Sequence, residues 1–259
     1  MHQHTDGSLD TELRQTQARR PRAVHFLIAL CTVGLGLALV PPANSQTKHA
    51  SARHASAKPS ELPAPQKSYG SASAPITMEV FSDYQCPTCR NLFEQTLRPM
   101  IGDYVASGKV YLVHRDFPLA GHLYSGQAAR WANAAARVGK FDAAEAALYD
   151  NQSTWEADGN MEKFISAAMS AADFARVQKA MQGCEAPGPT AGPTGGISPS
   201  PKPCAIDPFI AEDIMLGLKL PVHATPTYVI TYKGQRLPAG AGLVSWPILK
   251  QFFDSLLSH

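Results

Sequence analysis

Two cysteines separated by two residues are the first part of this sequence that could carry out chemistry. Cys86 and Cys89 lie in the stretch VFSDYQCPTCRNLF, Val80–Phe93, between a β-rich apolar run and a segment with helical periodicity. Such a pair can bind a metal, staple a fold, or exchange electrons as a dithiol and a disulfide. The elements around the cysteines decide between these three uses.

The cysteine pair lies where a predicted strand, Ile76–Ser82, ends and a helix begins. The first turn of a helix has unpaired backbone N–H groups and the positive end of the helix dipole, and both stabilise a thiolate. Spacing i, i+3 puts both sulfurs on one side of this turn. Pro87 suits a first helical position, because its missing N–H costs nothing there. We therefore expect Cys86 to be the exposed attacking thiolate and Cys89 the more buried resolving thiol.

Zinc binding and structural stapling are weaker interpretations of the same pair. A zinc site usually contains a second close pair of cysteines, whereas Cys184 and Cys204 are separated by the nineteen residues 185–203. A disulfide within a four-residue loop gives little loop-closure stabilisation. We therefore predict redox chemistry at Cys86 and Cys89, with no metal and no other cofactor.

A Thr-Pro step directly before another predicted strand is the second chemical feature. The stretch HATPTYVI, His223–Ile230, suggests a cis peptide bond between Thr225 and Pro226. A cis bond here leaves the preceding backbone free to pair with an extended substrate. A trans proline is equally allowed at the start of a strand, so the motif alone is weak.

Three polar residues could tune the cysteines. Asp83 could shift their pKa values or move protons, although an Asp at such a position more often caps a turn. His122 lies at a predicted helix start, where we expect it to make structural hydrogen bonds. His223 could approach Cys86 and stabilise its thiolate when charged.

The rest of the chain predicts a β-α-β unit, a helical block and a final β-β-α unit, which together give a sheet covered by helices. Strands are expected at Ile76–Ser82, Lys109–Phe117, Thr225–Tyr232 and Gln235–Ala241. Helices are expected after Cys89 with a kink at Pro99, from Gly121 to about Gly139, and at Phe141–Tyr149, Met161–Met169, Ala172–Gly183, Asp207–Leu218 and Ser245–Leu257. The Pro- and Gly-rich segment 185–203 excludes helix.

The N-terminal part of the chain is typical of an exported protein. A segment with four arginines precedes the apolar run Ala23–Val40. We predict that residues 1–45 are a cleaved signal peptide or an uncleaved N-terminal membrane anchor, and that residues 46–66 are a disordered linker. The remainder would then lie in the periplasm or on the extracytoplasmic side of the membrane. The four cysteines beyond residue 45 fit disulfide chemistry in such an oxidising compartment.

The charge balance excludes one class of partner. The formal net charge is +2 over 259 residues, so no strong basic field favours nucleic acid.

Together the motifs resemble those of the DsbA-like thiol–disulfide oxidoreductases of the thioredoxin superfamily. The family's active-site segment is similar to FSDYQCPTC in this chain, and its cis-proline loop is similar to ATPTYVI. The family's inserted helical domain begins with a strand, a Pro-Leu turn and an Ala-rich helix, and these are similar to HRDFPLAGHLYSGQAARWANAAARVGKF. The resemblance extends from about Tyr69 to the C-terminus. It implies an α/β protein with a thioredoxin fold and an inserted all-helical subdomain.

The resemblance also implies domain limits and residue roles. A DsbA-like thioredoxin domain would span residues 67–259, with a helical insertion at about 121–219. Cys86 would be the nucleophile and Cys89 the resolver. Support for the site would come from Pro87, Thr88, Thr225 and the cis proline Pro226.

The segment 185–203 is a departure from the family pattern. Cys184 and Cys204, which bracket it, could close it in a second disulfide worth about 3 kcal/mol in the loop-entropy model. Alternatively, the two cysteines could relay electrons to the pair Cys86 and Cys89.

The function implied is that of an exported thiol–disulfide oxidoreductase, and above all of an oxidase that forms disulfides. Its partners would be exported protein substrates with cysteines and a membrane redox partner that regenerates it, and it would act as a monomer. A reductase or isomerase that uses the same pair is one alternative. A redox-inactive domain that binds peptides, as a chaperone does, is another.

Overall fold

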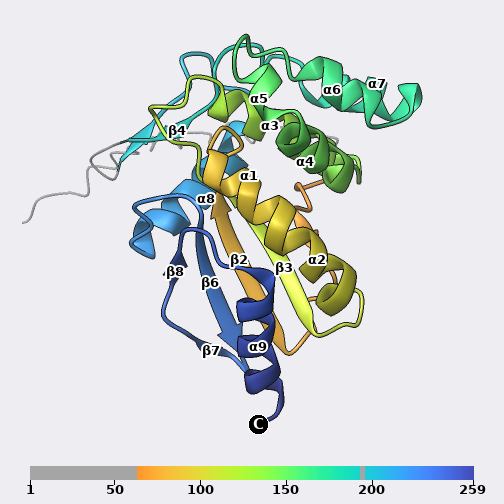
Figure 1. The fold of residues 1–259 in the computed structure, drawn as a ribbon. Helices are drawn as coiled ribbons and strands as arrows, with labels where there is room; N and C mark the ends of the chain where they lie inside the picture. Colours follow the sequence, from red (N-terminus) through yellow and green to blue (C-terminus); the bar gives the residue numbers. More distant parts are fainter. Residues whose placement is uncertain (1–62, 193–195) are drawn as a thin grey trace, which may run out of the picture. The chain divides into compact units, whose positions relative to one another are not determined.

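The computed structural model describes residues 63–192 and 196–259 (Figure 1). The predicted signal or anchor, residues 1–45, and residues 46–62 of the predicted linker lie outside this part. Within the described part, no helix combines the length and the apolar composition that crossing a bilayer requires.

A mixed sheet lies at the centre, with strand order β1-β3-β2-β6-β7 and with β8 paired to β6. Its strands are β1 (Ser68–Tyr69), β2 (Ile76–Ser82), β3 (Val110–Asp116), β6 (Thr227–Tyr232), β7 (Gln235–Arg236) and β8 (Gly240–Ala241). Strand β2 is parallel to β3 and antiparallel to β6. The three long strands match the predicted ones, whereas β1 was not predicted. The single strand predicted at Gln235–Ala241 is wrong: it is divided into β7 and β8, because Pro238 cannot donate to a ladder.

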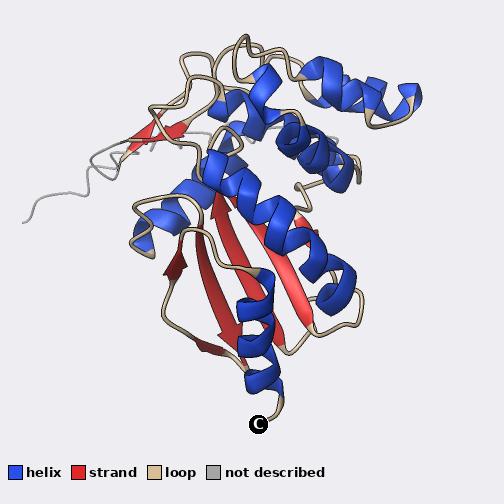
Figure 2. Cartoon of the chain, in the orientation of Figure 1, coloured by secondary structure: helices blue, strands red, loops and turns tan. Residues whose placement is uncertain are grey.

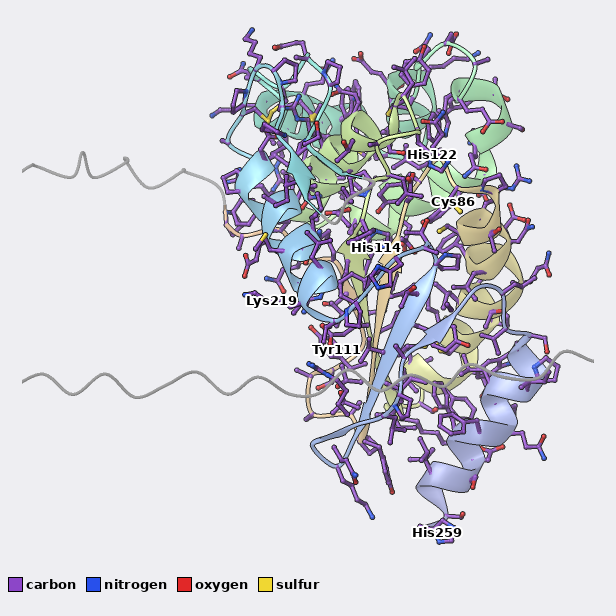
Figure 3. The ribbon with its side chains drawn as sticks, turned by 90° about the vertical axis from the view of Figure 1, so that its left-hand side faces the viewer. Cys86, Tyr111, His114, His122, Lys219 and His259 are labelled. Atoms are coloured by element: carbon purple, nitrogen blue, oxygen red, sulfur yellow. A yellow bond between two sulfur atoms is a disulfide. The ribbon has the colours of Figure 1, made fainter. Side chains whose placement is uncertain are left out.

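Helices cover both faces of this sheet (Figure 3). Helix α8 (Asp207–Lys219) lies on one face, and α1 (Pro87–Leu92), α2 (Arg98–Met100) and α9 (Trp246–Leu257) lie on the other. Gly217 lets α8 approach the sheet closely, because a Cβ at this position would lie 2.6 Å from the Phe117 ring. The apolar faces of the sheet therefore pack between two layers of helix.

The chain remains helical around Pro99, where the sequence predicts a kink. Two π-helical segments, Phe93–Leu97 and Ile101–Val105, flank α2 on either side of this proline. Proline has no N–H to donate within a helix and displaces the preceding turn. The wider π-type turns accommodate it within one continuous helical run.

A block of helices is inserted between β3 and α8. It comprises α3 (Ser125–Arg137), α4 (Phe141–Asp150), α5 (Gln152–Trp155), α6 (Glu162–Ala167) and α7 (Ala171–Ala180). The first helix begins at Ser125 rather than at the predicted Gly121, because residues 119–124 instead form hydrogen bonds with the turn before the cysteine pair. The block is followed by a short antiparallel pair, β4 (Thr190–Ala191) and β5 (Ile197–Ser198), which was not predicted and is seen in Figure 2.

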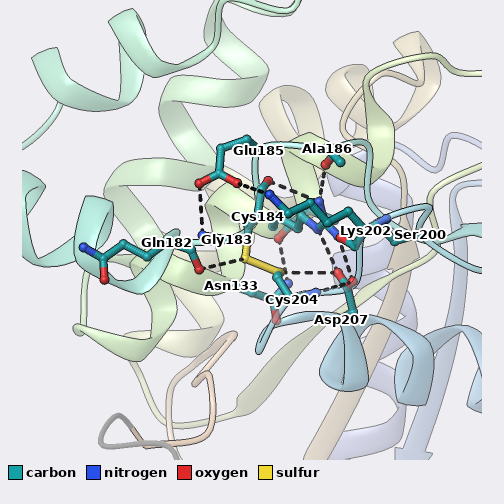
Figure 4. The surroundings of a disulfide bond; sticks show 12 residues. Asn133, Gln182, Gly183, Cys184, Glu185, Ala186, Ser200, Lys202, Cys204 and Asp207 are labelled. Atoms are coloured by element: carbon teal, nitrogen blue, oxygen red, sulfur yellow. Dashed lines mark hydrogen bonds and ion pairs between the residues drawn. A yellow bond between two sulfur atoms is a disulfide. The ribbon is translucent and has the colours of Figure 1, made fainter.

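A disulfide and a buried arginine hold the two ends of segment 185–203. Cys184 and Cys204 are joined with an S–S distance of 2.11 Å (Figure 4). Arg130, whose side chain is fully buried, forms a bidentate ion pair with Asp207 at 2.7 Å. Its guanidinium also donates to Ser200 Oγ and to the carbonyl oxygens of Cys184, Ala186 and Lys202. This set of hydrogen bonds compensates for burying the charge.

A second buried charge network ties the start of the domain to β3 and α8. The ammonium group of Lys67 pairs with Asp116 on β3 and, at 2.5 Å, with Asp213 on α8. On the other side of Asp116, His114 lies 3.5 Å from this carboxylate and 2.9 Å from that of Glu145 on α4. Burial lowers the pKa of His114, but the two carboxylates outweigh this effect and raise it to about 9.

His114 should make the stability of the fold depend on pH. Because its pKa is raised from 6.5 to about 9, its contribution is present in full below pH 6.5 and is lost as pH rises through 9. The loss should be on the order of 3 kcal/mol. Urea unfolding of the wild type and of His114→Gln at several pH values measures it, since groups common to both proteins cancel in the difference. A difference that does not change between pH 6 and pH 9 would contradict the assignment.

Removal of the disulfide should weaken the fold. Replacing Cys184 and Cys204 by serine releases a loop of about 20 residues, which in the chain-entropy model costs about 3 kcal/mol. Denaturant unfolding of the double variant, with Cys86 and Cys89 kept reduced in both proteins, measures this loss. An unchanged free energy of unfolding would mean that Arg130 alone holds the segment.

Candidate active site

The cysteine pair lies at the junction of β2 and α1, at the upper end of the sheet as drawn in Figure 3. Cys86 is the N-cap of α1 and has an extended backbone, and Pro87 occupies the first helical turn. Both cysteines carry free thiols. Cys86 retains 7% of its surface and Cys89 only 1%. The expected order of exposure is therefore present, but Cys86 is less exposed than the sequence suggests.

The environment drives the pKa values of the two thiols in opposite directions. The pKa of Cys86 is lowered to about 6, chiefly by the hydrogen bond from the Cys89 thiol, while burial opposes the shift. The backbone N–H groups of Thr88 and Cys89 and the side chain of Thr225 lower it further. The pKa of Cys89 is raised well above its usual range, first by burial and then by the neighbouring Cys86. At neutral pH Cys86 is thus largely a thiolate and Cys89 a thiol, which is the division of roles that disulfide exchange needs.

The loop before β6 brings Thr225 and Pro226 against Cys86. The peptide bond between these two residues is cis. The Sγ atom of Cys86 lies 3.4 Å from the carbonyl oxygen of Thr225. The Thr225 hydroxyl is buried without another hydrogen-bond partner, so it is available to donate to the Cys86 thiolate. The loop is fixed from behind, because Gly242 donates to the Pro226 carbonyl oxygen at 2.8 Å.

Asp83, three residues before Cys86, is a buried anchor rather than an isolated turn cap. Its carboxylate accepts the backbone N–H groups of Gln85 and Leu119, each at 2.8 Å. It also accepts the Ser125 hydroxyl at 2.5 Å and His122 Nδ1 at 2.6 Å. One carboxylate thereby joins the active-site turn to the start of the inserted helices. An Asp at this position is expected to cap the turn, but the turn contact to Gln85 is only one of the four contacts that Asp83 makes.

His122, rather than His223, is the histidine associated with the cysteines (Figure 3). Its hydrogen bond to Asp83 is the main cause that raises its pKa, and burial opposes this. The charges of Asp83 and Cys86 raise it further. No contact joins His223 to Cys86 within the described residues, and its side chain is exposed. The structure therefore corrects the suggestion that His223 stabilises the thiolate.

Gln152 is a site residue that no sequence pattern pointed to. It lies on the short helix α5 and is 1% exposed. Its amide donates to the carbonyl oxygens of Tyr84 and Cys86, at 2.6 and 3.0 Å. The inserted helices thus hold the backbone of the active-site turn directly. A glutamine in a polar stretch carries no sequence signal for such a role.

Among the described residues, no group of three or more His, Cys, Asp or Glu side chains is arranged to hold a metal ion. The chemistry that the side chains themselves can support is exchange between a stabilised thiolate, a protonated thiol and an incoming sulfur.

Comparisons with known proteins agree with this geometry. A family model described as Thioredoxin matches residues 64–188. Among curated proteins, none matches the sequence. The solved structures of Wolbachia pipientis alpha-DsbA1 and Pseudomonas aeruginosa DsbA2 are similar, with 19% and 25% identity and TM-scores of 0.55 and 0.52. These matches cover 76% of this chain and 94% and 97% of the other chains.

A third similar structure is a thioredoxin-like oxidoreductase from Silicibacter pomeroyi. It has 23% identity and a TM-score of 0.53, over 74% of this chain and 92% of that one. The likenesses confirm the predicted fold class, a thioredoxin fold with inserted helices, and the resemblance to DsbA-like proteins.

Replacing Cys89 tests the main cause of the low pKa at Cys86. Cys89→Ala removes the donor, and we expect the pKa of Cys86 to rise from about 6 toward the usual value of about 8.5. Cys89→Ser keeps a hydroxyl donor at the same place and should hold the pKa much closer to the wild-type value. Ultraviolet absorbance of the thiolate against pH measures both variants. The same pKa in the two variants would show that the hydrogen bond is not the cause.

Proposed function

We propose that this chain is a protein thiol–disulfide oxidoreductase that forms disulfides in its substrates through Cys86 and Cys89, a function that its similarity in fold to DsbA proteins supports. The observation that carries the proposal is the difference in pKa between the two thiols. The pKa of Cys86 is lowered to about 6, whereas that of Cys89 is raised so that this thiol stays protonated. A stabilised Cys86 thiolate is also a good leaving group, and it favours the reduced form of the pair.

In the forward reaction a substrate thiolate attacks Sγ of Cys86 in the oxidised pair. A mixed disulfide forms with Cys86, the bond between Cys86 and Cys89 breaks, and Cys89 leaves as a thiolate that takes up a proton. A second thiolate of the substrate then attacks the substrate sulfur of the mixed disulfide and releases Cys86 as a thiolate. Two substrate thiols have then become one disulfide, and two electrons have passed to the enzyme pair.

The thiolate stabilisation favours the oxidase direction. The backbone N–H groups of the first turn of α1 and the Cys89 thiol stabilise the charge on Cys86 only in the reduced state. Stabilising the reduced form makes the disulfide a stronger oxidant, as in the case of DsbA. The reductase and isomerase alternatives would need a pair whose reduced form is less favoured.

We also infer that the domain acts on the extracytoplasmic side of the membrane, on exported proteins that contain cysteines. The disulfide between Cys184 and Cys204 supports this location, since such bonds persist in oxidising compartments. Export would depend on the apolar segment Ala23–Val40. Turnover requires that a redox partner in the membrane accept the two electrons from Cys86 and Cys89.

Single cysteine variants test the proposed reaction. The wild type, first oxidised with glutathione disulfide, should restore activity to a reduced, unfolded disulfide protein. Cys86→Ser should lose this activity completely, because it cannot form the disulfide with Cys89 that a substrate thiolate attacks. Insulin reduction by the reduced protein should be lost in the same variant. Undiminished turnover by Cys86→Ser would refute the oxidoreductase proposal and favour a redox-inactive peptide-binding domain.

The second cysteine pair provides the matched control. In our proposal Cys184 and Cys204 hold the fold and do not pass electrons, so the double serine variant should retain exchange activity at a temperature where it is folded. Loss of exchange in a folded double variant would instead support the electron-relay alternative.

A further inference from the structure

A pocket with a volume of about 590 Å³ lies within the inserted helices. This volume is in the size range of small-molecule binding sites. Its lining comes from α3 and the turn before it, from the loop between α5 and α6, from α6 and α7, and from the start of segment 185–203. Neither Cys86 nor Cys89 belongs to the lining, so the proposed disulfide exchange does not account for this pocket.

The charged side chains that line the pocket are all negative. Three exposed carboxylates, from Asp158, Glu162 and Glu185, belong to different parts of the insertion. Among the described lining residues there is no lysine, arginine or histidine. Outside the lining, Lys202 lies 3.7 Å from Glu185. The pocket therefore has a negative rim that favours a positively charged ligand.

The more buried residues of the lining add apolar surface and an acceptor that has no donor. Trp131 and Met181 are 8% and 7% exposed, and the Trp131 ring stacks on Phe174. The Oε1 atom of Gln127 is buried, and no residue of the described part of the chain donates a hydrogen bond to it. Leaving a buried acceptor unpaired is unfavourable. A ligand that has both a hydrocarbon chain and an N–H donor would satisfy this part of the pocket.

One wall of the pocket depends on the start of segment 185–203. Glu185 follows Cys184 directly, and its carboxylate accepts the Gly183 N–H at 3.0 Å beside the disulfide (Figure 4). Further along, Gly188 packs on the first turn of α3, where a Cβ on Gly188 would lie 2.3 Å from the Gly126 carbonyl oxygen. The insertion that departs from the family pattern thus supplies part of the lining.

We propose that this pocket binds a cationic ligand that consists of an aliphatic chain ending in an ammonium or guanidinium group. The charge lies among the carboxylates of the rim, an N–H of the ligand donates to Gln127 Oε1, and the chain covers Trp131 and Met181. The face of an aromatic ring such as Trp131 also attracts cations. A free polyamine and a lysine or arginine side chain of a polypeptide share this chemistry. The inference goes beyond the proposed disulfide exchange, because ligand binding here uses no sulfur.

Titration with a diamine and its neutral isostere tests the ligand class. Hexamethylenediamine and hexanediol have the same chain, but only the diamine is charged. Hexanediol should bind about tenfold more weakly, because it forms no charge-assisted hydrogen bonds. NMR of the nitrogen-labelled chain measures both affinities: the indole N–H of Trp131 should shift, and that of Trp246 on α9, which does not line the pocket, should not. Added salt should weaken binding of the diamine.

Two isosteric substitutions test the carboxylates of the rim. Asp158 accepts the Asn160 N–H at 2.8 Å, and Glu162 accepts the Gln178 amide at 3.0 Å. Asp158→Asn and Glu162→Gln keep an acceptor oxygen for these bonds and remove only the charge.

Each of these variants should weaken binding of the diamine about fivefold, and the double variant about twenty-five-fold. Asp103→Asn and Glu212→Gln are the matched controls, because they remove the same charges from exposed side chains outside the lining. Both controls should bind the diamine within about twofold of the wild type.

A second probe distinguishes the two sources of the ligand. Lysine blocked as its acetyl and methylamide derivative carries one ammonium group on an aliphatic chain, as a lysine in a polypeptide does. Tighter binding of the diamine would indicate a free polyamine, and tighter binding of the lysine derivative would indicate a polypeptide side chain. Binding of neither probe would overturn the inference.

Equal affinity for the diamine and hexanediol, or unchanged affinity in the double variant, would also overturn it. Cys86→Ser should bind the diamine as the wild type does, so a failure of the proposed disulfide exchange would leave this result unchanged.

Discussion

The hydrogen bond from the Cys89 thiol to the Cys86 thiolate is the interaction on which the rest of the site depends. It requires one sulfur at the open end of α1 and the other one turn inside, where burial keeps it protonated. The junction of β2 and α1 supplies both positions, and the cis-proline loop brings Thr225 to the same sulfur. The charge is therefore stabilised by donors that the fold fixes before any substrate arrives, which is how a preorganised site lowers the cost of forming charge.

Buried side chains connect this site to the inserted helices, and the inserted helices to segment 185–203. Asp83 joins the active-site turn to the start of α3, and Arg130 in the middle of the same helix holds the base of segment 185–203. Each has several hydrogen bonds, as a buried charge requires. Gln152 on α5 adds a second connection to the active-site turn. The insertion is thus part of the reactive site, because Ser125 and Gln152 hold the backbone and the Asp83 anchor of the cysteine turn.

The sequence alone was sufficient to predict the features that interactions between neighbouring residues determine. Alternating and apolar patterns located the long strands, and a CxxC pair at a strand-to-helix junction indicated the unequal thiols. It was insufficient where contacts join distant segments. His122 reaches Asp83 because the turn after β3 folds back, and no spacing rule distinguishes it from His223. The β4–β5 pair depends on backbone hydrogen bonds to Pro118 and Ala120. The composition of a segment rich in Pro and Gly does not predict such bonds.

The reduction potential of the pair Cys86 and Cys89 tests the central claim most directly, because stabilisation of the Cys86 thiolate should make the pair an oxidant. Equilibration of the purified protein with glutathione buffers of known ratio, followed by alkylation of free thiols, gives this potential. We predict a value closer to that of DsbA, about −120 mV, than to that of thioredoxin, about −270 mV. A potential at or below that of thioredoxin would contradict it and assign the pair to reduction.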